Sequence, residues 1–389
     1  MSKVLIQESS YETCQAAIEQ VFETFPMDLK GKRVCIKVNG VAPKDPHEYA
    51  FVTDYRFVRA VLNVVEKFEP AEIVVGDSVG TGMFGKSEAV WESTHLREAA
   101  GKYFKNFSTN LELREVERPI KKTVAIIKDV LDADVYISLP KLKTHGLTII
   151  TGAVKNNYGL YAGLQKSKWH YDSITPENFA HAVVESYKLR KPDLIIIDGI
   201  LSQMGYGPAS LEVNRTNKVI AGTDGVAMDT VFTDMLGLTV DDIPLLRICR
   251  EQNLGETDLS KIEVIGNRVI PEYWHVPVPP LCSYAYRVND TGGTNAILPF
   301  RERAACRPVV DMAICATCET CAEEPLCVAK CPIGALSKNG DTITCATDKC
   351  LQCTSCMERC PVKAAVLQIH PEIFEALTER EKKCYPLFV

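Results

Sequence analysis

Apolar runs alternate with helical patterns over the first 270 residues. Continuous β-branched runs, strong at first and weaker later, lie at 33–38, 72–75, 134–139, 193–197, 218–221 and 262–265. Amphipathic stretches at 55–68 and 177–189 separate some of them. Strands that are apolar at every position are buried on both faces, as in parallel sheets covered by helices. The pattern predicts an α/β domain over residues 1–270 with an open, mostly parallel sheet of the doubly wound kind.

The pattern changes after residue 270. Six prolines and a Thr-Gly-Gly-Thr turn fall between residues 271 and 308. Proline lacks an N–H donor and fixes φ, so an irregular connector is expected over 271–307. Its tyrosines and tryptophan predict that it packs on a domain. We expect a small α+β domain over 308–370, and a C-terminal tail over 371–389.

Cysteine usage changes this picture most. The chain has sixteen cysteines, and ten of them lie between Cys315 and Cys360. No apolar run reaches the 18 residues or so of a membrane span, and the N-terminus lacks a signal-peptide pattern, so a cytoplasmic protein is expected. Disulfides are disfavoured in a reducing compartment, and the cysteine-rich segment therefore indicates metal binding. The scattered cysteines are expected to be buried or inert thiols.

The later cysteine motif is complete. Cys350, Cys353, Cys356 and Cys360 follow the spacing of the bacterial ferredoxin run, with Pro361 directly after the last cysteine. In that run three thiolates bind one [4Fe-4S] cluster and the fourth binds the other cluster. The alternative, a zinc ribbon, places its cysteine pairs a dozen or more residues apart.

The earlier motif has one cysteine too many. It consists of Cys315, Cys318, Cys321, Cys327 and Cys331, with an insertion before Cys327. The spacing from Cys327 to Cys331, which precedes a proline, is that of a usual motif end. Cys327 is therefore expected as the third ligand, and two of the three cysteines before it supply the rest. The spacing leaves open which two.

The two motifs form an internal repeat. If the fourth cysteines are exchanged as in ferredoxins, Cys360 completes the first cluster and Cys331 the second. A hairpin signal at 338–341 separates the halves. Cys345 ends a strand-like segment and is not expected to be a ligand. The module is thus predicted to carry two [4Fe-4S] clusters.

A basic segment stands out in the large domain. The chain has a net charge of −6, which argues against nucleic acid as a partner, yet residues 135–171 contain no Asp or Glu. Lys141, Lys143, His145 and Lys155 lie there among Pro, Gly and Asn. Loops after parallel strands bind ligands in open α/β sheets, so these residues are candidate catalytic groups acting on an anion. The alternative is a solvated basic face.

Polar residues at the ends of other predicted strands are candidate contacts to a cofactor or other anion. They are Lys37, Asn39, Asp77, Ser78 and Asn156. Period-two alternation places Lys37 and Asn39 on one face.

The segment 76–85 also fits two known patterns. Residues 76–80 fit Gly-x-Ser-x-Gly, and residues 80–85 fit a dinucleotide fingerprint. The glycine-rich continuation disfavours a hydrolase elbow, which turns straight into a helix. The absence of a second strand ending in an acid disfavours a nucleotide site. A ligand loop of another kind is favoured.

These motifs resemble those of the uncharacterised Fe–S centre proteins known as the domain-of-unknown-function 362 family. The matching segments are 36–39, 74–78, 139–145, 152–159, 192–199 and 224–229. The resemblance implies an iron–sulfur protein of a kind found mostly in anaerobes, without an assigned substrate.

Three functions remain open. The first is an iron–sulfur oxidoreductase that passes low-potential electrons through the clusters to a small anionic substrate, or to an unidentified anionic cofactor. The second is an electron-transfer or reductive-activation partner of another redox enzyme or of a ferredoxin. The third is a cofactor or metal maturation factor. The direction of electron flow and the oligomeric state stay open, with a homodimer among the options.

Overall fold

The computed structural model describes most of the chain in two stretches. The first is 1–269, except 42–45, 47, 80–86, 120, 146–147, 163–164, 167–168, 170–172, 174–175 and 205–211. The second is 306–369, except 322–323, 330, 332–333, 347–355 and 357–359. The expected connector, apart from Cys306 and Arg307, and the expected tail lie outside the described residues.

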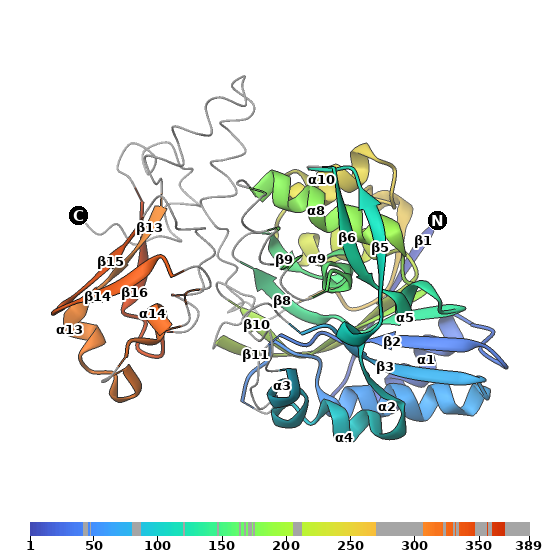
Figure 1. The fold of residues 1–389 in the computed structure, drawn as a ribbon. Coiled ribbons are helices and arrows are strands. Elements are labelled where there is room, and N and C mark those ends of the chain that lie inside the picture. Colours follow the sequence, from blue (N-terminus) through green and yellow to red (C-terminus); the bar gives the residue numbers. More distant parts are fainter. Residues whose placement is uncertain are drawn as a thin grey trace.

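A ten-stranded sheet organises the first stretch (Figure 1). Its main path runs β12-β1-β11-β10-β7-β2-β3-β4, and β8 and β9 extend it from β10. The strands are β1 (Ser2–Glu8), β2 (Arg33–Lys37), β3 (Glu72–Asp77), β4 (Phe104–Asn106), β7 (Val135–Ser138), β8 (Lys141–His145), β9 (Ile149–Thr151), β10 (Leu194–Met204), β11 (Glu212–Gly222) and β12 (Ile262–Gly266). The expected α/β class with a mostly parallel sheet is confirmed.

Strand direction follows the expectation except at β11 and β9. The strands β4, β3, β2, β7 and β10 are all parallel to their neighbours. β11 instead runs antiparallel to both β10 and β1. The predicted runs at 33–38, 72–75, 134–139, 193–197 and 262–265 all fall on strands of this sheet, and the run at 218–221 falls on β11.

Helices cover both faces of the sheet (Figure 1). They are α1 (Cys14–Thr24), α2 (Tyr55–Val65), α3 (Ser87–Ser93), α4 (Leu96–Ala100), α5 (Lys128–Leu131), α6 (Ala153–Asn156), α8 (Pro176–Leu189), α9 (Gly225–Met235) and α10 (Pro244–Glu251). Two apolar cores result. In β2, Val34 and Ile36 join the core formed with α1 and α2, whereas Cys35 joins the core formed with α8, α9 and α10. This alternation explains why the strands are apolar at every position.

A hairpin of β5 (Leu111–Val116) and β6 (Lys122–Ile127) lies outside the large sheet. In the sequence, this hairpin lies between β4 and β7. Val116, Val124 and Ile126 from this hairpin pack into the same core as α8.

The second stretch contains two small antiparallel pairs and short helices. β13 (Cys306–Val310) pairs with β16 (Ala365–Ile369), and β14 (Leu336–Asn339) pairs with β15 (Thr342–Cys345). The helices are α13 (Met312–Cys315) and α14 (Leu326–Ala329). The predicted hairpin at 338–341 is confirmed, with Gly340 at a φ of 59° in its turn. Strand β13 begins slightly before the expected boundary at residue 308.

Candidate functional site

Polar side chains gather where three parallel strands end. The register places Lys37 of β2 opposite Gly76 of β3 and opposite Ser138 of β7. The carboxyl ends of these strands therefore meet at one edge of the sheet, which is where open α/β sheets bind ligands. Lys37, Asp77 and Ser138 are all buried there.

A buried ion pair forms the base of this site. The Lys37 Nζ lies 2.8 Å from Asp77 Oδ1, and both side chains are almost fully enclosed. Asp77 also accepts hydrogen bonds from the backbone N–H of Gly40 and of Ser78, each at 2.8 Å. Gly159 borders the pair, because a Cβ at that position would lie 2.5 Å from the Lys37 Nζ. The chain thus provides close backbone contact around a paired charge.

An amide network extends from the ion pair. Asn156 Oδ1 accepts from Lys37 Nζ at 3.4 Å and from Asn39 Nδ2 at 3.1 Å. Asn39 Oδ1 in turn accepts from Lys143 Nζ at 2.8 Å, and Asn156 donates to Ser138 Oγ at 2.8 Å. We call Lys37, Asn39, Asp77, Lys143 and Asn156 the lysine–amide cluster. Five predicted residues from four separate segments of the sequence are thus connected by direct contacts.

Lys166 is a further basic residue at this site. Its ammonium contacts the carbonyl oxygen of Ser78, the Ser78 Oγ at 3.0 Å and the Val79 carbonyl oxygen at 3.1 Å. Burial lowers the pKa of Lys166 to about 7, and the nearby charges of Lys37 and Lys155 act in the same direction. The sequence placed Lys166 in the acid-free segment but gave no reason to select it.

Lys141 belongs to a different contact group. Its Nζ lies 2.7 Å from Asp198 Oδ2 and 3.0 Å from the Tyr11 hydroxyl. The backbone N–H of Asp54 also donates to Asp198 at 2.9 Å. Burial raises the pKa of Asp198, and Lys141 opposes this shift. Among the described residues, the contacts of Lys141 connect β8 to β10 and Tyr11 rather than to the lysine–amide cluster.

His145 and Lys155 are close in sequence to the cluster members Lys143 and Asn156. The His145 side chain is buried, and its Nδ1 accepts from the backbone N–H of Thr148 at 3.3 Å. Lys155 is half-buried, with its Nζ 5.7 Å from the centre of the Tyr158 ring.

Ile149 has a φ of 64°, which is strained for a β-branched residue. Such strain is often found at functional sites.

Asp229 of α9 fixes the short helix that carries Asn156. Its carboxylate accepts from the backbone N–H of Ala153 at 2.7 Å and of Val154 at 3.0 Å. Burial raises the pKa of Asp229 from 3.8 to about 7. The Asp229 carboxylate can lie this close to α6 because residue 152 is glycine. A Cβ at that position would lie 1.9 Å from Asp229 Oδ1.

We expect this carboxyl to make stability depend on pH. Between its unfolded pKa of 3.8 and its folded pKa of about 7, the folded chain holds a proton that the unfolded chain has lost. Its stabilising contribution is therefore complete at low pH and declines as the pH rises toward 7. Asp229→Asn removes the titration, so the difference in unfolding free energy between wild type and variant should fall by about 2–3 kcal/mol from pH 5 to pH 8.

Urea unfolding at the two pH values measures this difference. Asp234→Asn, at a partly exposed carboxylate of the same helix, is the control. If the difference in unfolding free energy between wild type and Asp229→Asn stayed constant from pH 5 to pH 8, the raised pKa of Asp229 would be contradicted.

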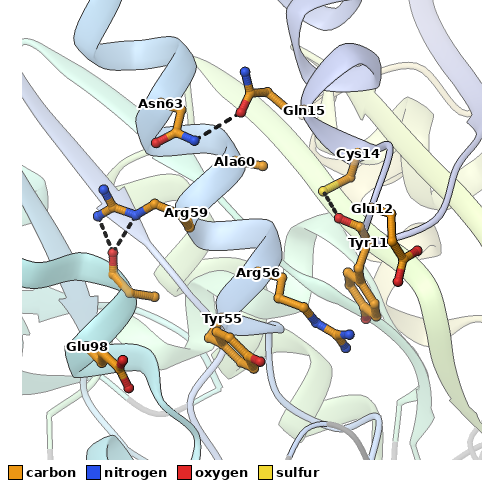
Figure 2. Close-up of a pocket in the computed structure, with 11 residues that line it drawn as sticks. Tyr11, Glu12, Cys14, Gln15, Tyr55, Arg56, Arg59, Ala60, Asn63 and Glu98 are labelled. Carbon is orange, nitrogen blue, oxygen red and sulfur yellow. Dashed lines mark hydrogen bonds between the residues drawn. The ribbon is translucent and has the colours of Figure 1, made fainter.

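A cleft of about 430 Å³ lies between α1 and α2 (Figure 2). The Arg56 guanidinium lies 4.0 Å from the Tyr11 ring centre and is paired with Asp54 at 2.8 Å. Asn63 donates to Gln15 at 2.9 Å across the two helices. The described lining includes none of the side chains that the sequence predicted as site residues. Tyr11 links the cleft to the buried Lys141–Asp198 pair.

The C-terminal cysteines form a buried group. Cys315, Cys318, Cys321, Cys327 and Cys360 are each no more than 9% exposed. Cys315 and Cys360 pack in one apolar cluster. Burial raises the pKa of Cys327 to about 11, with Cys315 and Cys360 as the next contributors. Cys321 instead contacts Cys318 by a side-chain hydrogen bond.

Two sulfurs receive equivalent backbone hydrogen bonds. Ala335 N–H donates to Cys331 Sγ at 3.2 Å, and Ala364 N–H donates to Cys360 Sγ at 3.1 Å. Each donor lies four positions after its cysteine, so the sequence repeat is also a structural repeat. Cys350 and Cys353 lie outside the described residues. Within the described part of the chain, no three His, Cys, Asp or Glu side chains are arranged to hold a single metal ion.

The scattered cysteines whose side chains the structure describes are buried, as expected. Cys14, Cys35 and Cys249 are buried in the large domain, and burial raises the pKa of each thiol. Cys345 ends β15 as predicted and packs, partly buried, beside Cys327 and Cys356. No helix among the described residues is long and apolar enough to cross a membrane.

Comparison with known proteins gives a curated relative and several structural neighbours, two of which are a lactate racemase apoprotein and a protein from Thermotoga maritima. The thylakoid-associated protein sll1697 of Synechocystis sp. (strain ATCC 27184 / PCC 6803 / Kazusa) is 37% identical over 153 residues. The match covers 39% of this chain and 48% of that protein, so it spans about half of the relative's length.

Both of these structural neighbours are distant. The lactate racemase apoprotein from Thermoanaerobacterium thermosaccharolyticum has a TM-score of 0.37 and 14% identity, covering 53% of this chain and 51% of that chain. A protein from Thermotoga maritima has a TM-score of 0.36 and 13% identity, covering 56% and 57%.

The family comparison covers the segment that builds the site. The profile of a domain of unknown function, DUF362, matches residues 34–234 of the 389. Every member of the lysine–amide cluster lies within this range. The chain therefore belongs to the DUF362 family.

Proposed function

We propose that this protein is an iron–sulfur oxidoreductase. Two [4Fe-4S] clusters in the C-terminal module supply low-potential, one-electron transfer. The lysine–amide cluster of the large domain binds the anionic electron acceptor. The observation that carries the proposal is the repeated N–H···S hydrogen bond at Cys331 and Cys360, within a group of buried cysteines.

The cysteine arrangement suits a cubane cluster. Hydrogen bonds to sulfur stabilise negative charge on thiolates and tune cluster potentials. A buried thiolate group without bound iron would be costly, because burial disfavours the charged form. Each thiolate of a cubane binds a different iron atom, so the arrangement needed differs from that around a single ion. The cysteines that the structure describes therefore fit such clusters.

The contacts favour one ligand set for the first cluster. Cys327 has Cys315 and Cys360 as its main charged neighbours, and Cys315 has Cys360 and Cys318. Cys321 is a lesser charged neighbour of Cys327, after Cys315 and Cys360, and it is the hydrogen-bond partner of Cys318. We infer that Cys315, Cys318, Cys327 and Cys360 bind the first cluster and that Cys321 does not.

This ligand set predicts different results for two neighbouring cysteines. Cys327→Ser should lower the iron content of anaerobically purified protein from about eight to about four atoms per chain, because one of two four-iron clusters is lost. Cys321→Ser should keep about eight. Iron and sulfide analysis, together with the paramagnetic resonance spectrum after dithionite reduction, measures both.

Cys14→Ser is the control, since Cys14 is a buried thiol of the large domain. Loss of iron in Cys321→Ser with retention in Cys327→Ser would overturn the ligand set. Wild-type protein that binds zinc in place of iron would overturn the proposed function itself.

The large domain favours a small acceptor over a docked protein. Lys37, Lys143 and Asn156 are each no more than 2% exposed, so a protein surface cannot reach them without rearrangement. Buried cations and amide donors are suited to an anion, since donors in a water-excluded site act strongly on charge. The alternative, an electron carrier for another enzyme, needs no such interior site.

Native mass spectrometry of the anaerobically purified chain separates these functions. If the protein is a reductase, we expect the wild type to carry a bound small anion. The anion should be lost in Lys143→Met and kept in Lys3→Met, where the replaced lysine is exposed. An empty large domain in wild-type protein, with both clusters present, would favour the carrier.

A further inference from the structure

Ser78 and Lys166 form a hydroxyl–amine pair beside the lysine–amide cluster. Ser78 follows directly after β3 and is 2% exposed, and Lys166 is 5% exposed. The Lys166 Nζ lies 3.0 Å from the Ser78 Oγ. A serine hydroxyl in contact with an enclosed amine has the arrangement of a nucleophile and its base.

Three oxygen atoms surround the Lys166 amine. The carbonyl oxygens of Ser78 and Val79 and the Ser78 Oγ each accept from Lys166 in its protonated form. Loss of one proton leaves two N–H donors and a lone pair. The lone pair is then within reach of the Ser78 hydroxyl, which can donate to it over the same 3.0 Å. In this state the amine accepts the hydroxyl proton, as a general base must.

The surroundings favour that neutral state near neutral pH. Burial brings the pKa of Lys166 to about 7, with the charges of Lys37 and Lys155 as further causes and Asp77 opposing them. A lysine that is desolvated and close to other cations is a recognised route to a reactive amine at physiological pH.

We propose that Ser78 and Lys166 form a catalytic dyad for acyl transfer, with Ser78 as the nucleophile and Lys166 as the base. The substrate class is an ester or thioester of an anionic acid. Lys155, which is half-buried and close enough to influence Lys166, provides positive charge for the acid group. This activity needs neither cluster and is separate from the proposed electron transfer.

The reaction balances without an added oxidant or reductant. The Ser78 Oγ attacks the acyl carbonyl carbon while its proton moves to Lys166 Nζ. The bond to the leaving alcohol or thiol breaks, and the leaving group takes that proton from Lys166. Water then attacks the acyl-serine with Lys166 again as base, which releases the acid and restores the hydroxyl.

The Gly-x-Ser-x-Gly pattern of residues 76–80 did not itself predict this pair. The sequence disfavoured a hydrolase elbow there, and it did not indicate Lys166 as a partner of Ser78. The link to Lys166, 88 positions away, is what indicates chemistry.

A fluorophosphonate reagent, which phosphonylates activated serines, tests the dyad on the full chain. Peptide mass spectrometry should place the label on Ser78. The labelling rate should rise about tenfold from pH 6 to pH 8, because the neutral fraction of a base with a pKa of about 7 rises by that factor. Ser78→Ala should abolish the label, and Lys166→Arg should slow it about 100-fold or more.

Ser186→Ala, at a buried serine of α8, is the matched control and should label like wild type. Hydrolysis of mono-(4-nitrophenyl) succinate, an anionic ester, should follow the same order among the variants. Absence of label on Ser78 in folded wild-type protein overturns the dyad, even if Lys166→Arg fails to fold. So does a wild-type labelling rate that does not change between pH 6 and pH 8. Iron content is measured separately, so loss of the clusters and loss of labelling are distinguishable.

Discussion

Lys37→Met is expected to lower the free energy of unfolding of the large domain by about 3–5 kcal/mol, the usual cost of breaking a buried ion pair. The variant leaves the Asp77 carboxylate enclosed with only two backbone donors, from Gly40 and Ser78. Those hydrogen bonds offset part of the desolvation cost, but they supply no full positive charge. Urea unfolding at pH 7 measures the loss.

A double-mutant cycle separates the ion pair from simple packing. Asp77→Asn keeps an oxygen for the backbone donors and removes the charge. The Lys37→Met, Asp77→Asn double variant should therefore lose less stability than the sum of the single variants, by about 1–3 kcal/mol. Lys3→Met, in an exposed pair with Glu263, is the control and should cost at most about 1 kcal/mol. Strict additivity in the cycle would show that Lys37 and Asp77 do not stabilise each other.

Hydrophobic runs predicted the centre of the sheet because burial on both faces leaves a strong local signal. The strands β2, β3 and β7 are of this kind, and their parallel arrangement was correctly expected. The direction of β11 was not predictable in the same way. A strand with apolar residues on both faces has the same pattern whether its neighbour is parallel or antiparallel, and direction depends on the connection.

β8 shows a different limit. Its sequence, Lys141–His145, is strongly polar and was interpreted as a loop, yet all five residues are buried in a strand. Buried lysines are compatible with a strand only when partners are supplied, here Asp198 for Lys141 and Asn39 for Lys143. Those partners come from other parts of the chain, so a local pattern cannot reveal them.

The same limit explains why the site was predicted only in part. Alternation placed Lys37 and Asn39 on one face, and both contact Asn156 as that placement requires. Tyr11 was missed, because it meets Asp198 only through a contact that spans 187 positions. Lys166 was seen as one basic residue among several, and only the fold distinguishes it by placing it against Ser78.

Gly152→Ala is expected to destabilise the large domain by about 3 kcal/mol or more. The new methyl carbon would lie 1.9 Å from Asp229 Oδ1 and 2.7 Å from its Cγ. Asp229 is fully buried, so its carboxylate has no open space to enter. Displacing it removes two hydrogen bonds to the start of α6 and leaves a buried carboxyl group without them. Crowding of the packed core adds to this cost.

The consequence should reach the site, because α6 ends in Asn156, which joins Lys37 to Asn39. Gly152→Ala should therefore also abolish binding of the small anion, whereas Gly31→Ala should not. Gly31 has a φ of 69° with nothing within 4 Å of its Cβ position, so that variant costs only about 1–2 kcal/mol from backbone strain. Urea unfolding and native mass spectrometry of both variants compare the two effects. Equal losses of unfolding free energy in Gly152→Ala and Gly31→Ala would contradict the prediction. Crowding against Asp229 would then cost no more than backbone strain at an open position.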